Sequence, residues 1–398
     1  VCSSDLIRQH CHVGSVEADV LASVEAPIVL LEKTSANTLA PDVAPEQKLF
    51  GFMLPYTPLH HLLLADLDFP IVMTSANPSD TPQCIDNEHA RSELKGIADY
   101  WLMHDRDIRN RVDDSVVRVV DHKPRILRRA RGHTPASMPL PKGFEHAPEV
   151  LAYGGELKNT FCLIKNGEAI LSQHMGDLEN ATVYDDVTHH LDLYQRLFDH
   201  HPTCLAVDAH PEYLSSKLGR SRAETEGLQL VEVQHHHAHM AACLLEHQWP
   251  LEGGKVLGIV MDGLGLGEDE NLWGGEFLWA DYNACKRLGH LQPVALLGNH
   301  QAMREPWRNT YAQLVSNFAW EDLRASYPEL ELLSFLEQKP LKTLNAMMVK
   351  GMNAPLASSC GRLFDAVAAA VGLCRDRVTY EGQAAIVLEA LVTREHVM

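Results

Sequence analysis

Short apolar runs alternate with helical spacing over the first third of the chain. The strand-like runs lie at 27–31, 48–55, 70–76, 114–120 and 125–130. Segments with apolar residues three and four positions apart lie between them, at 57–67 and 87–102. Proline and glycine mark the turns. Strands that alternate with helices in this way predict an α/β fold.

A second α/β pattern begins at Val150. Alternating apolar and polar residues surround a Gly-Gly turn and an Asn-Gly turn up to residue 178, which predicts a hairpin with further strands. Further predicted elements are strands at 204–210, 228–233 and 255–263 and helices at 183–198 and 213–224. From about residue 302 the pattern is mostly helical. Four prolines within 134–149 separate the two blocks, and we expect a linker over 137–149.

Composition narrows the class of protein. At 398 residues the chain can form two or three domains, and 45% hydrophobic with 22% charged residues is ordinary for a globular protein. The net charge of −19 argues against a broad nucleic-acid surface, because binding phosphates needs an excess of Lys and Arg. Nine scattered cysteines without a Cys-x-x-Cys pair give no zinc ribbon and no disulfide framework. No apolar run could span a membrane and no signal pattern opens the chain, so we expect a cytoplasmic protein that binds neither membrane nor nucleic acid.

We expect the chain to be truncated at both ends. Residues 1–6, VCSSDL, are what a widely used sequencing adapter encodes, and we expect them to be foreign. The last residues, LVTREHVM, follow closely on a helix-like run without a polar tail. We therefore expect both termini to be artificial.

Four histidines in five positions stand out in the stretch QHHHAHMAA at 234–242. His235 and His239 are four residues apart at the start of a predicted helix, so both imidazoles lie on one face and suit a divalent metal. The Glu of a His-Glu-x-x-His protease motif is absent. His236 and His237 are expected to point elsewhere, to the surface or behind the ligands. An exposed polar helix start is the alternative.

A carboxylate and three glycines follow at the end of a predicted strand. Asp262 stands at the strand's carboxyl end, and Gly263, Gly265 and Gly267 would let the backbone come close to a ligand. The spacing is not G-x-G-x-x-G, so it does not support a dinucleotide site. An acidic strand end before a glycine turn also occurs in actin-like ATPases and sugar kinases, where it handles phosphates and metal. A plain tight turn is the alternative.

Other polar positions leave two interpretations open. Lys158, in YGGELKNT, could bind phosphate or sit in an ordinary hairpin. Asp365 lies one turn into a predicted helix and could bind a ribose or simply cap the helix and face solvent. Ser75 and Asn77, in VMTSANPSD (72–80), could hold a phosphate or close an Asx-turn.

Arginines gather between residues 106 and 131. Eight of them lie there beside Lys123 and four aspartates, at Arg106, Arg109, Arg111, Arg118, Arg125, Arg128, Arg129 and Arg131. In so acidic a chain this excess favours an anionic ligand, because the fork of Arg suits phosphate and carboxylate. Pairing with the nearby aspartates is the alternative for each of them.

Taken together, these stretches resemble the HypF family of hydrogenase maturation carbamoyltransferases. Four stretches resemble its YrdC-like domain, which we place at 7–136. They are FGFMLPYTPLHHLLL, PIVMTSANPSD, NRVDDSVVRVV and LRRARGHTP. Eight later stretches resemble its TsaD-like domain, which we place at 150–398. They are GGELKNTFCL, LSQHMGDLEN, VDAHPEYLS, VQHHHAHMAA, MDGLGLGEDENLWGGEFL, REPWRNTYAQL, SSCGRLFDAVAA and YEGQAA. The resemblance implies a partial YrdC-like α/β domain followed by a C-terminally truncated domain with the actin-like ATPase fold.

The resemblance also implies an activity. Members of the family make carbamoyl-adenylate from carbamoyl phosphate and ATP, and pass the carbamoyl group to the C-terminal Cys of HypE on the way to the cyanide ligands of nickel–iron hydrogenase. The implied cofactors are a divalent metal, Fe or Zn, and ATP with Mg. No catalytic residue is assigned. The implied site residues are His235, His239 and Asp262 for the metal, Gly263, Gly265, Asp365 and Lys158 for the nucleotide of the TsaD-like domain, and Ser75, Asn77 and Arg111 for the adenylation site of the YrdC-like domain.

The chain departs from the family pattern at both ends. We expect four parts of the family pattern to be missing. They are the N-terminal acylphosphatase-like domain, the Cys-x-x-Cys zinc-finger region, the Lys/Arg stretch that opens a YrdC-like fold and the segment with the last metal-ligand aspartate. We expect the chain as it stands to bind metal weakly and to be inactive or impaired. The alternatives are a tRNA threonylcarbamoyladenosine synthase-like enzyme, which the acidic charge disfavours, and a fragment that only docks maturation partners. The joint presence of His235, His239 and Asp262 disfavours a mere scaffold.

Overall fold

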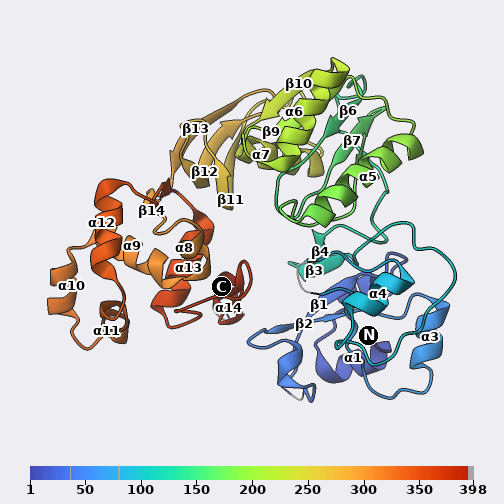
Figure 1. The fold of residues 1–398 in the computed structure, drawn as a ribbon, viewed down its shortest axis with the longest axis horizontal. Coiled ribbons are helices and arrows are strands. Elements are labelled where there is room, and N and C mark those ends of the chain that lie inside the picture. Colours follow the sequence, from blue (N-terminus) through green and yellow to red (C-terminus); the bar gives the residue numbers. More distant parts are fainter. Residues whose placement is uncertain (36, 79–80, 393–398) are drawn as a thin grey trace. The chain divides into compact units, whose positions relative to one another are not determined.

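A computed structural model describes residues 1–35, 37–78 and 81–392. The last two positions of the motif at 72–80, and the last six of the expected TsaD-like domain, lie outside these residues. The chain folds into two compact units (Figure 1): Val1–Leu140 with Phe144–Glu232, and Pro141–Gly143 with Val233–Met398. Helices and strands occur in both units, so the predicted α/β class is confirmed. No helix among the described residues combines the length and the apolar character that a membrane span needs.

The first unit contains a four-stranded sheet in the order β2-β1-β3-β4. Its strands are β1 (Ile28–Glu32), β2 (Leu49–Phe52), β3 (Val116–Val120) and β4 (Lys123–Arg128). The helices of this part are α1 (Ser4–His10), α2 (Ser15–Leu21), η1 (Pro41–Val43), α3 (Pro58–Leu64) and α4 (Asn87–Glu93). β1 runs antiparallel to β2 and parallel to β3. Val29 and Leu31 alternate into a core shared with Phe50 and Phe52, as the two-residue period of a strand requires.

Two predicted elements of this part are wrong. Residues 70–76 form no strand; Val72 is 70% exposed, and the run pairs with no neighbouring strand within the described residues. The helix predicted over 87–102 ends at Glu93, because Gly96 adopts a φ of +84°, a left-handed conformation that an α-helix cannot continue through. The other strands and the helix predicted for this part are present.

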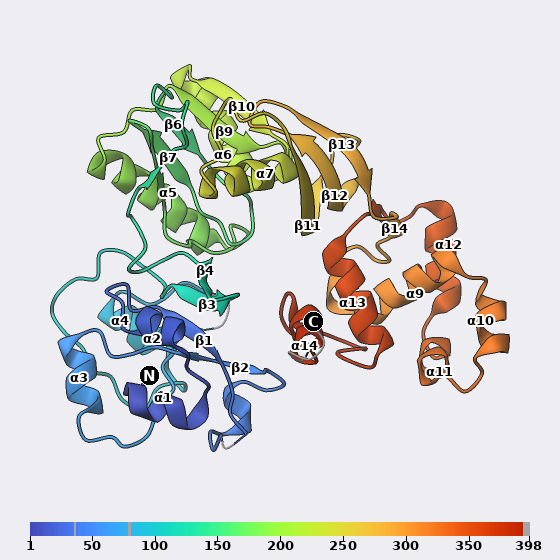
Figure 2. The ribbon, with the colours of Figure 1, turned by 180° about the vertical axis from the view of Figure 1, so that it is seen from behind.

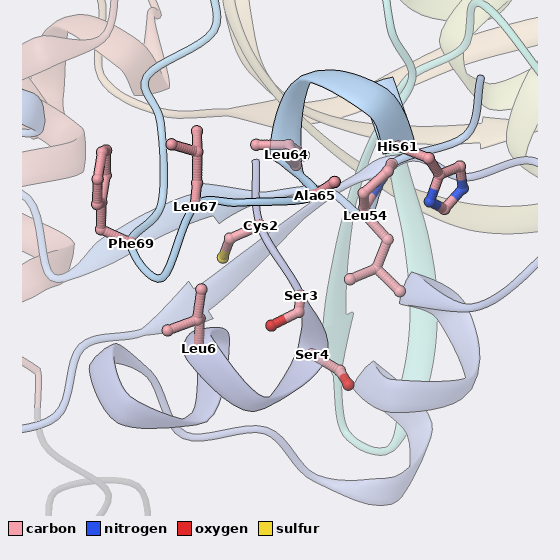
Figure 3. Close-up of a pocket in the computed structure, with 11 residues that line it drawn as sticks. Cys2, Ser3, Ser4, Leu6, Leu54, His61, Leu64, Ala65, Leu67 and Phe69 are labelled. Carbon is pink, nitrogen blue, oxygen red and sulfur yellow. The ribbon is translucent and has the colours of Figure 1, made fainter. Parts of the chain in front are cut away.

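A cavity of about 340 Å³ lies beside α1 and α3 (Figure 3). Its lining is mostly apolar and consists of Cys2, Ser3, Ser4, Leu6, Leu54, Pro55, His61, Leu64, Ala65, Leu67 and Phe69. The residues predicted for the metal, nucleotide and adenylation sites do not line it.

A six-stranded sheet follows in the same unit, in the order β10-β9-β6-β7-β8-β5. Its strands are β5 (Met138–Pro139), β6 (Val150–Ala152), β7 (Cys162–Lys165), β8 (Glu168–Leu171), β9 (Cys204–Asp208) and β10 (Gln229–Val233). The helices α5 (Ala181–Leu197) and α6 (Leu214–Glu226) belong to this part (Figure 2). Leu151, Leu163 and Leu205 are register partners on three neighbouring strands, and they form one core with apolar residues of α5 and α6.

The Asn-Gly turn and the expected linker both belong to this sheet. Asn166 and Gly167 adopt φ values of +53° and +76° between the antiparallel strands β7 and β8, as a type I′ hairpin requires. The predicted hairpin is therefore confirmed. Within the stretch expected to be a linker, Met138 and Pro139 form β5 and pair with β8, so part of that stretch is an edge strand.

The second unit has a sheet in the order β11-β12-β15-β14, with β13 also paired to β12. Its strands are β11 (Val256–Leu266), β12 (Leu272–Ala280), β13 (Cys285–His290), β14 (Val294–Ala295) and β15 (Leu356–Ala357). The prediction of a glycine turn directly after Asp262 is wrong. β11 continues to Leu266, and its register against β12 shifts between Met261 and Gly265. Gly263 and Gly265 lie within this irregular strand, where the backbone can bend toward its neighbours, and Gly267 follows directly after it.

Helices make up most of the rest of the second unit, as predicted from residue 302 onward. They are α7 (His235–Glu246), α8 (His300–Arg304), α9 (Trp307–Asn317), α10 (Trp320–Ser326), α11 (Glu331–Glu337), α12 (Leu341–Lys350), α13 (Cys360–Ala370) and α14 (Gln383–Ala390). Met240 of α7 packs with Val260 of β11, which fixes the start of α7 against that strand. Trp307, Tyr311 and Leu336 belong to a separate core among the later helices.

Candidate metal centre

Helix α7 begins at the histidine cluster because Gln234 caps it. The Gln234 side-chain oxygen accepts a hydrogen bond from the backbone N–H of His237 at 2.9 Å and so satisfies one of the free donors at the helix start. The helix then places His235 and His239 one turn apart on the same face. The predicted spacing of the pair therefore rests on a helix with a defined first residue.

The structure brings His235 and His239 together with Asp262 of β11. The Nε2 atoms of the two histidines are 3.2 Å apart, and they lie 3.4 Å and 3.8 Å from Asp262 Oδ2. One possible ligand atom from each of the three residues falls within 4.8 Å of the others. Two imidazole nitrogens and a carboxylate oxygen at such distances are a donor set for a divalent transition metal.

Asp262 faces this cluster as a carboxylate. Burial raises the pKa of its carboxyl group, but the contacts with His235 and His236 and the nearby charge of His239 outweigh burial and bring the pKa well below its ordinary range. Its Oδ1 accepts from the backbone N–H of Gly263 at 2.6 Å. Its buried Oδ2 has no well-aligned hydrogen-bond donor among the described residues. An unpartnered carboxylate oxygen that faces imidazoles fits the coordination of a cation.

Gly265 makes room for the imidazoles. A Cβ atom at this position would lie 2.6 Å from Cε1 of His236 and 2.7 Å from Cδ2 of His235, closer than carbon atoms can approach. At Gly263 a Cβ would meet nothing within 4 Å. The two glycines predicted to bind nucleotide therefore differ: Gly265 is needed for the histidine cluster, whereas Gly263 leaves open space beside the strand.

The start of α13 lies against β11 in the same unit. Ser359 caps α13 by accepting from the backbone N–H of Arg362 at 3.0 Å, and its hydroxyl donates to the carbonyl oxygen of Gly263. Asp365, one turn further, is buried and lies 2.7 Å from the guanidinium of Arg362. Burial raises the pKa of Asp365 in spite of that charge. The structure thus excludes the alternative in which Asp365 only faces solvent, and its binding of a ribose stays a prediction.

Lys158 belongs to the first unit. Its backbone has a φ of +49°, and its N–H donates to Asp177 at 2.7 Å. Next to it, Asn159 is buried, and its side-chain amide donates to the carbonyl oxygens of Tyr153 and Gly155. These bonds shape the loop between β6 and β7, and the proposed contact of Lys158 with phosphate stays a prediction.

For His236 the sequence left two places open, the surface or behind the ligands, and the structure favours the second. Its side chain is completely buried rather than on the surface, and its Nε2 lies 3.4 Å from Asp262 Oδ2. His237 does point away, since its Nε2 is 2.7 Å from the carbonyl oxygen of Asp281. Three imidazoles of the stretch, not two, therefore face Asp262.

The buried ion pair of Glu276 and Arg287 was not predicted from the sequence. Glu276 of β12 is fully buried and accepts from Arg287 Nε at 2.6 Å, from the backbone N–H groups of Gly274 and Gly275, and from the Ser358 hydroxyl. Arg287 also lies 4.1 Å above the ring of Trp273. A charged residue inside the otherwise apolar strand pattern LWGGEFLWA was the signal that could have revealed it.

Ser75, Asn77 and Arg111 lie in neighbouring segments of the first unit. The backbone N–H of Cys84 donates to Ala76, and Arg111 Nε donates to the carbonyl oxygen of Gln83 at 2.6 Å. The Asn77 amide donates to Pro78 at 2.8 Å, while its buried Oδ1 has no partner among the described residues. That free acceptor lies in the segment predicted to take part in adenylation.

Some of the arginines follow the pairing alternative, and Arg111 does not. Arg111 forms an ion pair with Asp186 of α5, which is not one of the aspartates near it in sequence. Arg131 pairs with Asp114 at 2.7 Å. The other pairs of this kind are Arg109 with Asp107 and Arg128 with Asp113. Part of the positive charge at 106–131 is therefore balanced by aspartates of the chain.

Three family models match successive parts of the chain. The model described as "Telomere recombination" matches residues 1–130, and the "HypF Kae1-like domain" matches 145–246. The model described as "Carbamoyltransferase, Kae1-like Domain, second subdomain" matches 258–397. The histidines of the candidate metal centre lie in the second match and Asp262 in the third.

Individual relatives agree with these models. The carbamoyltransferase HypF of Rhodobacter capsulatus is 48% identical over 366 residues, 92% of this chain and 48% of the relative. The carbamoyltransferase HypF of Synechocystis is 41% identical over 97% of this chain and 50% of the relative. The chain thus spans about half the length of the curated relatives it matches.

Solved structures show the same likeness. A crystal structure of full-length HypF in the phosphate- and nucleotide-bound form superposes with a TM-score of 0.89 at 40% identity, covering 99% of this chain and 60% of that one. The structure of T. kodakarensis HypF gives a TM-score of 0.88 at 33% identity, covering 98% and 51%. On the strength of identities sustained along nearly its whole length, the chain belongs to the HypF carbamoyltransferase family.

Proposed function

We propose that the protein is part of a carbamoyltransferase of hydrogenase maturation that acts in the cytoplasm. It would form carbamoyl-adenylate from carbamoyl phosphate and ATP, and transfer the carbamoyl group to the C-terminal Cys of HypE. The observation that carries the proposal is the meeting of His235, His239 and Asp262 in a chain whose relatives are named carbamoyltransferases. A scaffold would not need three converging ligand atoms around a buried carboxylate oxygen.

The donor set fits a divalent metal, with Fe or Zn as the best candidates. His235 and His239 would each give an imidazole nitrogen and Asp262 a carboxylate oxygen. The unpartnered Oδ2 and the space that Gly265 leaves for the rings support this assignment. When bound, such a metal supplies a positive centre that can hold and polarise a phosphate or carbamoyl oxygen.

The chain's own residues would provide nucleotide contacts around that centre. Gly263 offers backbone beside open space, and Asp365 lies near the start of α13, whose cap bonds to Gly263. ATP would enter with Mg. Lys158 belongs to the first unit and is proposed separately as a contact for phosphate. In the first block, the Ser75 hydroxyl and the free Asn77 Oδ1 would hold the adenylate, with Arg111 shaping the segment through its bond to Gln83.

Metal content tests the centre directly. The parent chain, His235→Ala, His239→Ala and the control His237→Ala would be purified and their bound Fe and Zn measured by mass spectrometry. We expect both ligand variants to lose most of the metal and the control to keep it, because His237 bonds to Asp281 and not to Asp262. If both ligand variants kept all of their metal, the assignment of His235 and His239 as metal ligands would be wrong.

Adenylation needs a separate assay. Residues 7–392 would replace the matching half of the Rhodobacter capsulatus relative, and carbamoyl-phosphate-dependent exchange of labelled pyrophosphate into ATP would be measured. We expect exchange in the chimera and a fall of at least tenfold in Asn77→Ala. A folded, metal-loaded chimera without exchange would argue for a docking role instead.

A further inference from the structure

We propose that His236 is a positioning residue of the metal centre: it donates its Nε2–H to Asp262 and orients that carboxylate for the metal, without binding the metal itself. The proposal rests on the metal centre proposed above and adds a role for the third imidazole. It starts from His236 Nε2, a fully buried nitrogen 3.4 Å from Asp262 Oδ2 that has no other partner among the described residues.

The side chain of Gln234 fixes which nitrogen of His236 carries the proton. Its Oε1 accepts from the backbone N–H of His237 at 2.9 Å, and its Nε2 donates to the carbonyl oxygen of Leu266 at 2.9 Å. Exchanging the two amide atoms would set oxygen against oxygen at Leu266 and nitrogen against N–H at His237. The orientation of the amide is therefore determined at both ends.

The second hydrogen of that amide group points to His236. Gln234 Nε2 lies 3.1 Å from His236 Nδ1. An amide nitrogen can only donate, so Nδ1 must be the unprotonated, accepting nitrogen of the ring. A neutral imidazole then carries its hydrogen on Nε2, the atom that faces Asp262.

This tautomer separates His236 from the two candidate ligands. A metal needs a lone pair, and Nε2 of His236 has a hydrogen where that lone pair would be. The same hydrogen suits Asp262 Oδ2, which has lone pairs for both a metal and an N–H donor. At 3.4 Å a small rotation of the carboxylate closes the contact to an ordinary hydrogen bond.

The surroundings keep the ring in place. Cε1 of His236 lies against Gly265, where even one added carbon would come within 2.6 Å, and the Trp273 ring is 5.8 Å away between centroids. Trp273 is itself held by a 2.7 Å bond from its indole N–H to Asp269. His236 therefore has little freedom to turn, and a carboxylate that bonds to it is oriented as well.

Zinc titration of variants tests the role. The chain and its variants would be titrated with Zn²⁺ against a chromophoric chelator. We expect His236→Leu to bind zinc about 10–100-fold more weakly, the usual loss when a group that orients a metal ligand is removed. His236→Gln keeps an N–H donor near the position of Nε2 and should restore most of the affinity. His237→Gln is the matched control on the same turn and should bind like the parent.

Two spectroscopic measurements on folded protein decide between donor and ligand. Histidine nitrogen–proton NMR of the parent should show His236 protonated on Nε2, with and without Zn²⁺. The Co²⁺ absorption spectrum of His236→Gln should match that of the parent, because the coordinating atoms are unchanged. A proton on Nδ1, or an altered Co²⁺ spectrum, would make His236 a ligand and overturn the proposal.

The remaining outcomes are also decisive. Parent-like zinc affinity in His236→Leu would show that the contact with Asp262 positions nothing. Should His235→Ala and His239→Ala bind zinc as the parent does, the centre itself would be wrong and the role of His236 would fall with it. Loss of zinc in those two variants but not in His236→Leu would leave the proposed function intact and refute only the present inference.

Discussion

A single missing side chain decides whether the imidazoles can converge on Asp262. Gly265 lies against two rings of the cluster, and any Cβ there would overlap them. We predict that Gly265→Ala lowers zinc affinity at least tenfold and destabilises the chain by about 1–3 kcal/mol, the usual cost of overpacking. Zinc titration and urea unfolding measure the two effects. Gly289→Ala is the control, because its Cβ would lie 3.8 Å from its nearest neighbour, an ordinary contact; equal effects in both variants would contradict the prediction.

The buried carboxylate of Glu276 should make stability depend on pH. Burial raises its pKa, but the bonds from Ser358 and Arg287 outweigh burial and lower it below the ordinary value. Below the ordinary glutamate pKa of about 4.3, the unfolded chain takes up a proton here that the folded chain does not. Its contribution to stability is therefore complete above that pH and is lost as the pH falls through the lowered folded value.

Glu276→Gln tests this contribution. The variant should be less stable than the parent at pH 7, because an amide nitrogen would face the donors of Arg287, and its stability should fall less between pH 5 and pH 3. Urea unfolding at several pH values measures both. Parallel stability curves for variant and parent would show that Glu276 does not titrate differently in the two states.

At the scale of elements, local patterns predicted most helices and strands, and the misses have physical causes. The Asn-Gly turn fixed its hairpin because both residues favour positive φ. The run at 70–76 has strand-like composition, but a strand needs a neighbour to pair with, which no local pattern reveals. Asp262 was predicted at the end of its strand, but β11 continues to Leu266 because it pairs further with β12. For His236 the sequence left the surface and a place behind the ligands open, because burial of an imidazole depends on a distant glycine. The ion pair of Glu276 depends in the same way on β13.

The loop YGGELKNT also has a structural role that its sequence did not reveal. Glu156 is buried, and its carboxylate accepts from the backbone N–H of Leu214 at 2.7 Å, at the start of α6. The N-cap residue of that helix, Tyr213, provides no side-chain cap of its own. We predict that Glu156→Ala costs about 0.5–2 kcal/mol of stability, the range for a lost helix cap. Urea unfolding measures it, with the exposed Glu224→Ala on the same helix expected to change little.

At the scale of the whole molecule, family resemblance predicted the order of the domains, while the contacts between blocks came only from the structure. The proline-rich stretch at 137–149 was predicted to be a linker between two blocks. By its contacts, the first block shares a compact unit with the six-stranded sheet. Asp113 of the first block lies 2.8 Å from His174 Nδ1, and Arg111 pairs with Asp186 of α5. Pairing between residues so far apart in sequence has no periodicity to predict it.

The pair of Arg111 and Asp186 should therefore hold the first block to α5. Both side chains are 17% exposed, so removing either partner leaves a largely buried charge without its counterpart. In a double-mutant cycle, we predict that Arg111→Met and Asp186→Asn are each destabilising and together cost less than their sum, with a coupling of about 0.5–3 kcal/mol. The exposed pair of Arg109 and Asp107 is the matched control, for which the coupling should lie near zero.

Urea unfolding gives the energies of this cycle, and faster proteolysis at 141–149 in the single variants would show that the blocks separate there. Strictly additive effects would mean that the sheet and its core, and not this ion pair, join the two blocks.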